Sequence, residues 1–258
     1  MPIRIVIMIG LVGLGPAAFA ADSSTDEVKA LRREVQELKA GQAEILKNLK
    51  IVTDILLGKQ PPVENIEISV DGAFTLGEKT AKVTMIEFAD YQCPYCRDFA
   101  VQTFSQVVDT YVKTGRVRYV FRNFPLKQLH SLAEKAAEAA QCAGEEGKYW
   151  EAHDRFFKNP QALEMRDMPS NAAALGLDAV KFQRCLDSGK YEATVQSDLA
   201  EGMRLGVKGT PTFFFGYTDS RDPSKIRVIK LLSGAAPFDN YKQVLDDLLD
   251  TPRQGSDR

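Results

Sequence analysis

Between residues 22 and 57, apolar side chains recur with a seven-residue period that predicts one long helix. One heptad position holds Val28, Val35, Leu49 and Leu56, and the other holds Leu31, Leu38, Ile45 and Val52. Ser24 and Glu27 have the spacing of a capping box at its start, and Gln42 interrupts the apolar seam. A seam of two positions per heptad is typical of a parallel coiled coil that joins copies of a chain. A single amphipathic helix lying on its own domain is the alternative.

The pattern changes after residues 58–64, where one glycine and two prolines predict a linker. Residues 65–250 then alternate between short apolar runs, which predict strands, and stretches of helical period. The expected strands are 66–70, 82–89, 116–121, 212–215 and 226–232. Helices are expected at 93–113, in several pieces within 126–207, and after the last strand. This order predicts an α/β domain with a small mixed sheet, a helical subdomain inserted into it, and a polar tail at 251–258.

The N-terminal residues 1–20 predict an export signal. Arg4 is their only charged side chain, an apolar stretch follows it, and Ala18 and Ala20 have the spacing of a cleavage site. An uncleaved anchor is the alternative, because the charge-free run is close to the shortest that spans a bilayer. In both cases we expect the rest of the chain in the periplasm, where disulfides form and persist.

Composition and charge narrow the range of partners. The chain has 258 residues, 44% of them hydrophobic, which is enough for one substantial core. Lys and Arg total 33 against 35 Asp and Glu, so no basic excess favours nucleic acid as a partner. His130 and His153 could complete a zinc site with a cysteine pair, but neither has the spacing of paired ligands. We therefore expect no nucleic acid, no metal and no cofactor.

The segment FADYQCPYC places Cys93 and Cys96 three positions apart, where a strand is followed by a helix. Such a pair can be a redox catalyst, half of a metal site or a structural staple. Unpaired N–H groups and the helix dipole favour a charged first sulfur, which lowers its pKa from about 8.5 to ~3.5–7.5. Pro94 suits the first helical turn. We expect Cys93 to react with a disulfide and Cys96, shielded one turn further on, to resolve the mixed disulfide.

Two further positions add to this chemistry. Glu87 interrupts the apolar strand before Cys93, where burial would raise its pKa and suit it to exchange a proton with Cys96. Thr210 and Pro211 stand at the start of a strand, a position compatible with a cis bond and with an exposed edge for an extended substrate segment. The alternatives are a strand acid paired with a lysine and an ordinary turn proline.

The remaining cysteines, Cys142 and Cys185, both lie in the helical block. Four cysteines allow three connectivities, but the short spacing favours pairing of Cys93 with Cys96, which leaves 142–185 as a second, structural bridge. Closing a loop of that length is worth about 4 kcal/mol in the chain-entropy model. Two free buried thiols are the alternative.

The chain resembles the thioredoxin superfamily and, within it, the secreted thiol-disulfide oxidoreductases of the DsbA family. The resemblance covers residues 66–250 and is carried by EFADYQCPYC, AEKAAEAAQCA and GVKGTPTFFFG. It implies a thioredoxin-like fold and roles for four residues: the nucleophile Cys93, the resolving Cys96, the buried acid Glu87 and the cis-proline Pro211. Substrate contacts are expected from Pro94, Tyr95, Thr210 and Pro211. The best-known oxidase of the family has histidine where this chain has Tyr95, so one thiolate-stabilising group is missing.

These observations predict an exported oxidoreductase that acts on protein or peptide thiols and disulfides. Its expected partners are further copies of the chain, joined through the N-terminal helix, and a membrane redox partner, either a quinone-linked oxidase or a thiol reductase. Several dithiols facing a shared space favour a disulfide isomerase or reductase, and Thr210 points weakly in the same direction. A DsbA-type oxidase is one alternative. A non-enzymatic coiled-coil scaffold or surface protein with a fixed 93–96 staple is another.

Overall fold

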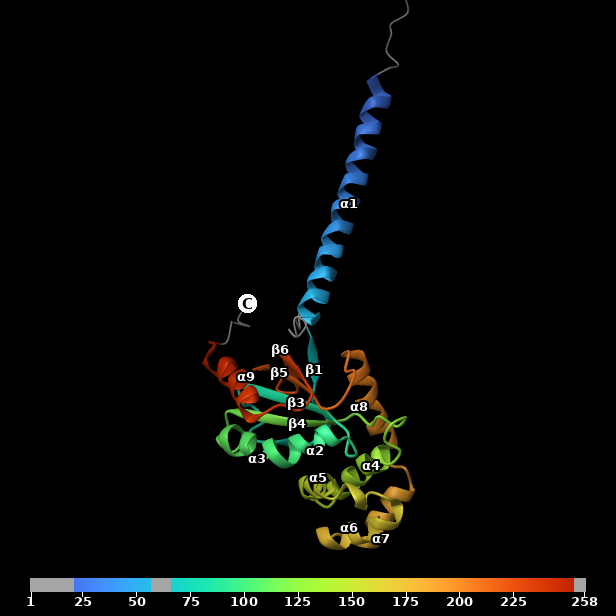
Figure 1. The fold of residues 1–258 in the computed structure, drawn as a ribbon, viewed down its shortest axis with the longest axis vertical. Helices are drawn as coiled ribbons and strands as arrows, with labels where there is room; N and C mark the ends of the chain where they lie inside the picture. The colour runs from blue at the N-terminus through green and yellow to red at the C-terminus, as the bar shows by residue number, and fades with distance from the viewer. Residues whose placement is uncertain (1–20, 57–65, 253–258) are drawn as a thin grey trace, which may run out of the picture. The chain divides into compact units, whose positions relative to one another are not determined.

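The computed structural model of the protein describes residues 21–56 and 66–252 (Figure 1). The predicted export signal at 1–20 and the linker at 58–64 lie outside the described residues, as does most of the predicted tail. The chain divides into two compact units, residues 1–59 and 60–258. Each unit is described by itself.

The first unit contains one continuous helix, α1 (Ala21–Leu56). Seven large apolar side chains between Val28 and Leu49 are exposed in the single chain, and Leu38 is the most exposed of these at 72%. These side chains are Val28, Leu31, Val35, Leu38, Ile45, Leu46 and Leu49. The predicted helix is therefore present, whereas the predicted coiled coil stays a prediction. Along the described parts of the chain, no helix has both the length and the apolar character needed to cross a membrane.

The second unit is built on a six-stranded sheet with strand order β1-β6-β5-β3-β4-β2. The strands are β1 (Glu67–Ser69), β2 (Thr75–Leu76), β3 (Val83–Ala89), β4 (Val117–Asn123), β5 (Thr212–Thr218) and β6 (Lys225–Ser233). β3 and β4 are parallel, as expected for two strands joined through a helix, and the other neighbouring pairs are antiparallel. The sequence pattern does not predict β2, because two residues are too few to show an alternation.

Helices follow the strands in the predicted order. They are α2 (Pro94–Asp98), α3 (Phe104–Val107), α4 (Ala133–Gly144), α5 (Tyr149–Lys158), α6 (Met168–Leu175), α7 (Ala179–Asp187), α8 (Glu192–Arg204) and α9 (Phe238–Asp250). α4 to α8 lie between β4 and β5, and Figure 1 shows α4 to α7 grouped together beside the sheet. Cys142 of α4 and Cys185 of α7 form a disulfide. The predicted thioredoxin-like α/β fold with a helical insertion is confirmed.

Both faces of the sheet are covered, which explains why β3 is buried along its whole length. Met85 and Tyr119 point to one face and pack in a core with α3, α9 and the insertion helices. Ile86 and Val120 point to the other face and pack with residues of α8. Successive side chains of β3 point to opposite faces of the sheet, and both faces are covered. A polar side chain in β3 is therefore buried whichever face it points to.

The segment after Cys93 differs from the regular helix predicted for residues 93–113. Two π-helical turns, Phe99–Thr103 and Val108–Val112, interrupt it. Each π turn holds more residues per turn than an α-helix and so rotates the following face. Phe99, at the start of the first π turn, is buried in the core, whereas Ala100 is only partly buried. Apolar periodicity alone cannot reveal such turns, because one extra residue in a turn barely alters the hydrophobic pattern.

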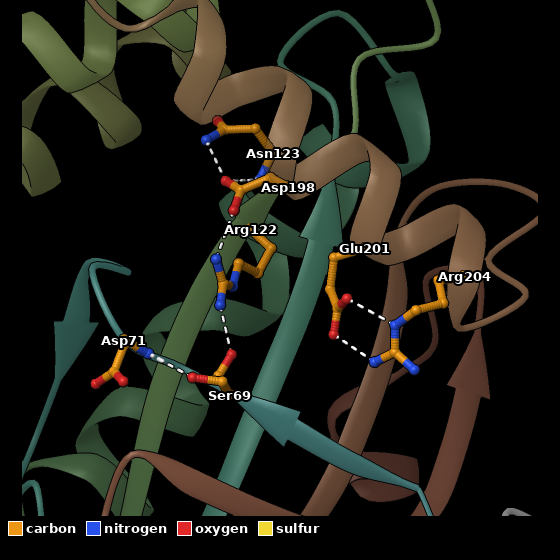
Figure 2. Close-up of polar contacts among 7 residues, drawn as sticks. All are labelled: Ser69, Asp71, Arg122, Asn123, Asp198, Glu201 and Arg204. Atoms are coloured by element: carbon orange, nitrogen blue, oxygen red, sulfur yellow. Dashed lines mark hydrogen bonds and ion pairs between the residues drawn. The ribbon is translucent and has the colours of Figure 1, made fainter.

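Helix α8 is fixed to the end of β4 by a buried polar cluster (Figure 2). Asp198 accepts hydrogen bonds from Arg122 Nη1 at 2.6 Å, from the Asn123 backbone N–H at 3.1 Å and from Asn123 Nδ2 at 2.9 Å. Helix α8 can pack closely against the segment that follows β4 because Gly202 has no side chain. A Cβ at this position would stand 2.5 Å from the Phe124 ring. The returning end of the insertion is thereby held on the sheet.

Candidate dithiol site

Cys93 stands where β3 has ended and α2 begins. Its backbone is extended, with φ −71° and ψ 123°, and Pro94 occupies the first turn of the helix. Cys93 N–H donates to Asp90 O at 3.1 Å, and Arg97 N–H donates to Cys93 O at 3.0 Å. This geometry places Cys93 Sγ at the end of the helix where backbone N–H groups are unpaired and negative charge is favoured.

The surroundings of Cys93 lower its pKa from 9.0 to about 6. The largest cause is a hydrogen bond from the Cys96 side chain, and burial acts in the opposite direction. The backbone N–H groups of Cys96 and Tyr95 lower it further. A thiol with this pKa is mostly thiolate at neutral pH, although Cys93 is only 4% exposed.

Cys96 is the opposite case. It is 0% exposed, and burial raises its pKa well above 9.0. Its hydrogen bond to Cys93 and the nearby charges of Glu87 and Cys93 raise it too, while the Asp90 backbone N–H, 3.5 Å from Cys96 Sγ, lowers it. Both cysteines are free thiols in this structure. The pair thus combines one readily ionised sulfur with one that keeps its proton.

The acid predicted beside the pair is Glu87 of β3, whose side chain points into the core beneath α2. It is 1% exposed, and burial raises its pKa from 4.5 to about 8. A hydrogen bond from Tyr119 on the adjacent parallel strand opposes this rise, whereas the charge of Cys93 adds to it. No lysine is needed to account for Glu87, because its partner in the structure is a phenol.

The loop that leads into β5 faces Cys93, because β5 runs antiparallel to β3 and begins where β3 ends. The Thr210–Pro211 bond is cis, and Cys93 Sγ, in its protonated form, donates to Thr210 O at 3.3 Å. Pro211 O in turn accepts from Gly234 N–H at 2.8 Å, just before β5 begins. Tyr95 is 63% exposed between the two cysteines. The structure therefore brings Cys93, Cys96, Glu87, Thr210 and Pro211 together.

Aromatic rings surround the pair and explain the burial that shifts these pKa values. The Phe99 ring packs against Phe213 and Tyr241, with centroids 4.6 and 5.1 Å away. A low-dielectric wall strengthens each electrostatic contact inside it and penalises an unpaired charge. Of the two sulfurs, only that of Cys93 accepts enough hydrogen bonds to stabilise its ionised form.

The two histidines do not join the cysteines in a metal site. His130 Nδ1 lies 2.8 Å from Asp90 Oδ2, and His153 of α5 is buried, with Nδ1 3.1 Å from Asp154 Oδ1. Burial lowers the pKa of His153. Within residues 21–56 and 66–252, no group of three or more His, Cys, Asp and Glu side chains is placed to hold a metal ion.

Sequence reasoning missed two polar residues of the site. Tyr119 gives no signal in the sequence, because its place opposite Glu87 depends on the register of two parallel strands. Asp90 does give one: an acidic residue just after a strand and three positions before Cys93 commonly caps a turn. Its side chain is fully buried and accepts several hydrogen bonds.

The model of a protein family described as Thioredoxin matches residues 69–230. The curated Na(+)/H(+) antiporter NhaA 3 of Salinispora tropica is 33% identical over 176 residues, which is 67% of this chain and 26% of that protein. The chain thus spans about a quarter of the length of the curated relatives it matches.

Solved structures share the fold. The alpha-DsbA1 of Wolbachia pipientis superposes with a TM-score of 0.61 at 23% identity, covering 70% of this chain and 93% of that one. A thioredoxin-like oxidoreductase from Silicibacter pomeroyi DSS-3 gives a TM-score of 0.58 at 27% identity, covering 70% and 95%. The family match includes both cysteines, Glu87 and the Thr210–Pro211 loop. The chain belongs to the thioredoxin family.

Proposed function

We propose that the protein is an exported thiol-disulfide oxidoreductase that works as an oligomeric disulfide isomerase or reductase. The observation that carries the proposal is the asymmetry of the dithiol, because the pKa of Cys93 is lowered to about 6 and that of Cys96 is raised well above 9.0. A structural staple gains nothing from an ionised thiol held beside a protonated one. The same asymmetry is what stepwise disulfide exchange requires.

The chemistry follows from these protonation states. In the reducing direction, the Cys93 thiolate attacks one sulfur of a substrate disulfide, which forms a mixed disulfide and releases a substrate thiolate. Cys96 then gives its proton to ionised Glu87, and its sulfur attacks Cys93 Sγ. The enzyme disulfide forms, the second substrate thiolate leaves, and two electrons have passed to the substrate. In the oxidising direction, protonated Glu87 returns the proton to Cys96; a pKa of about 8 supplies both forms near neutral pH.

The proposed substrates are cysteine-containing segments of unfolded or misfolded polypeptides. The Thr210 carbonyl lies 3.3 Å from Cys93 Sγ, so a backbone that pairs with this loop would hold its cysteine at the nucleophile. The exposed ring of Tyr95 offers an apolar contact that is indifferent to sequence. These contacts suit many protein substrates better than one small molecule.

The proposed isomerase activity depends on the association of several copies of the chain through α1. Its exposed seam would be covered by further copies of the chain, in parallel, and charge favours this arrangement: Glu27 and Arg32 fall at facing flanks of the heptad, as do Glu34 and Lys39. Several dithiols would then meet one substrate at high effective concentration. The number of helices in the coiled coil depends on how additional apolar residues after Gln42, such as Leu46, are packed.

A DsbA-type oxidase is the second candidate, and a specific observation favours it. Each contribution that lowers the pKa of Cys93 stabilises the reduced enzyme, which makes its disulfide a stronger oxidant. The pKa of about 6 lies between the values of ~7 for thioredoxin and ~3.5 for DsbA. The direction of electron flow is therefore set by the partner in the membrane, a quinone-linked oxidase or a thiol reductase.

Export to the periplasm is part of the proposal. It is supported by the signal pattern of residues 1–20 and by the Cys142–Cys185 disulfide, since such bonds persist outside the cytoplasm. Alkylation of cells quenched in acid tests the direction of catalysis there. Cys93 and Cys96 trapped mostly as thiols would support the isomerase or reductase. Trapping of the pair mostly as a disulfide would establish the oxidase instead.

Replacing Tyr119 by phenylalanine should shift the pH profile of the resolving step towards alkaline pH. The phenol lowers the pKa of Glu87, so its loss raises that pKa above 8 and leaves less carboxylate to accept the Cys96 proton at neutral pH. A hydrogen bond to a charged group is worth enough to move the midpoint by about one pH unit. The measurement is the rate of release of a peptide from its mixed disulfide with Cys93, followed against pH.

Tyr217→Phe is the matched control, because it removes a hydroxyl that donates to Leu248 O at 3.2 Å, in the same fold but at a different site. We expect its profile to coincide with that of the unmodified protein. If Tyr119→Phe and Tyr217→Phe gave the same profile, Tyr119 would have no part in proton transfer.

A further inference from the structure

Beside the dithiol, a buried carboxylate joins the turn before Cys93 to the first segment of the helical insertion. We infer that Asp90 is a positioning residue, which acts on the reactivity of Cys93 and Cys96 by fixing both segments at once. The inference rests on the proposed function, since it concerns the same thiol pair. It adds a residue to that site and makes the insertion a part of it.

The first contacts of Asp90 are with the loop that carries the nucleophile. Asp90 Oδ1 accepts the Gln92 backbone N–H at 2.7 Å, and Asp90 O accepts that of Cys93 at 3.1 Å. These two bonds close the turn between β3 and α2. The turn determines where Cys93 Sγ lies relative to the N–H groups of Tyr95 and Cys96, which help to keep it ionised.

The second contacts of Asp90 are with the segment between β4 and α4. Asp90 Oδ2 accepts the Leu126 backbone N–H at 2.7 Å and lies 2.8 Å from His130 Nδ1. The neighbouring Gln92 adds a contact in the same direction, because its Oε1 accepts the Leu132 N–H at 2.5 Å. The side chain of Asp90 is 0% exposed, so water does not compete for these bonds.

The backbone of Asp90 reaches the other sulfur. Its N–H lies 3.5 Å from Cys96 Sγ and opposes the rise in the pKa of that thiol. One residue is therefore in contact with the resolving cysteine through its N–H, with the nucleophile through its carbonyl, and with the insertion through its carboxylate. The two backbone contacts do not depend on the side chain, but the bonds of the carboxylate to Gln92, Leu126 and His130 do, and a side chain that only filled space would need none of them.

The direction of the effect follows from the contacts. If the turn loosens, the N–H groups at the start of α2 make weaker hydrogen bonds to the Cys93 thiolate. The pKa of Cys93 then rises from about 6 towards 9.0. The reduced form is then less favoured, so the Cys93–Cys96 disulfide becomes harder to reduce. A rise of about one pH unit changes the equilibrium constant with glutathione by about fivefold at neutral pH, through ionisation alone.

The test compares Asp90→Asn with Asp98→Asn, the same change at an exposed position of α2. In Asp90→Asn, the new amide would keep one acceptor oxygen but would present its NH2 group to a neighbouring N–H donor. His130→Ala is the second variant; it leaves residues 90–96 unchanged, and His130→Gln restores a donor at that position. For each full-length variant, the thiolate absorbance of Cys93 is titrated, the equilibrium with glutathione is measured, and the unfolding midpoint is recorded.

We expect Asp90→Asn to raise the Cys93 midpoint and to shift the glutathione equilibrium about fivefold towards the disulfide. His130→Ala should shift both in the same direction by less, His130→Gln should restore most of the change, and Asp98→Asn should match the unmodified protein. If Asp90→Asn does not fold, the inference is tested by the Cys93 titrations of His130→Ala and His130→Gln.

A lower unfolding midpoint with an unchanged Cys93 titration, in whichever of these variants folds, would overturn the inference and leave Asp90 a purely structural residue. Failure of the proposed function would look different. In that case the unmodified protein would not turn over insulin disulfides, even though the Cys93 titration still responded to Asp90→Asn.

Discussion

Cys93→Ser is expected to reduce the turnover of insulin disulfides to the uncatalysed rate, a loss of at least about three orders of magnitude. The serine hydroxyl does not ionise near neutral pH and cannot form a mixed disulfide. The remaining thiol, Cys96, is 0% exposed and keeps its proton, since its pKa is raised well above 9.0. It therefore cannot take over the attack. The measurement is the precipitation of insulin chains in the presence of a thiol reductant.

Removal of the other cysteine pair provides the control. The double substitution Cys142→Ser and Cys185→Ser removes the disulfide between α4 and α7 and leaves the dithiol loop unchanged. This variant should be less stable but should retain turnover at temperatures where it is folded. Activity that persists in Cys93→Ser would contradict the proposed role of Cys93 as the nucleophile, whereas the absence of turnover in the unmodified protein would favour a non-enzymatic scaffold.

Deletion of residues 22–57 is expected to leave insulin reduction intact and to abolish the refolding of scrambled ribonuclease. Reduction needs one dithiol, and residues 60–258 form a compact unit with its own core. Isomerisation benefits when several dithiols act on one substrate at high effective concentration, which is lost when the copies separate. Recovery of ribonuclease activity over time is the measurement.

Single substitutions on α1 give a finer version of this experiment. Leu38 lies on the seam and is 72% exposed in the single chain, whereas Arg33 lies on the opposite side of the heptad. Leu38→Asp should dissociate the assembly in sedimentation and lose isomerase activity, and Arg33→Asp should keep both. A truncated protein that refolds ribonuclease as well as the full chain does would remove the argument for a shared space.

The parts of the fold that the sequence predicts are those with a strong local signal. β3 is a continuous apolar run ending at the dithiol loop, and its parallel pairing with β4 follows from the helix between them. β2 and the π-helical turns could not be predicted, because two residues or one extra residue per turn barely alter the hydrophobic pattern.

The residues of the site likewise fall into those with a local signal in the sequence and those without one. Cys93 and Cys96 identify themselves by spacing, and Glu87 by its charge within an apolar strand. Tyr119 and the partners of Asp90 depend on contacts between segments that are distant in the sequence, such as Asp90 with Leu126. Such contacts exist only once the strands are in register and the insertion is folded. The hydrophobic and polar pattern along the chain therefore does not predict these contacts.

The central claim is that the fold makes one sulfur ionise easily while its neighbour keeps a proton. Titration of the reduced protein, followed by thiolate absorbance in the ultraviolet, tests it most directly. The account predicts that one thiolate forms with a midpoint near 6, that this step is absent in Cys93→Ser, and that the second thiol stays protonated beyond pH 9.0. If no thiolate formed until the pH approached 9.0, the fold would not make the Cys93 sulfur ionise easily.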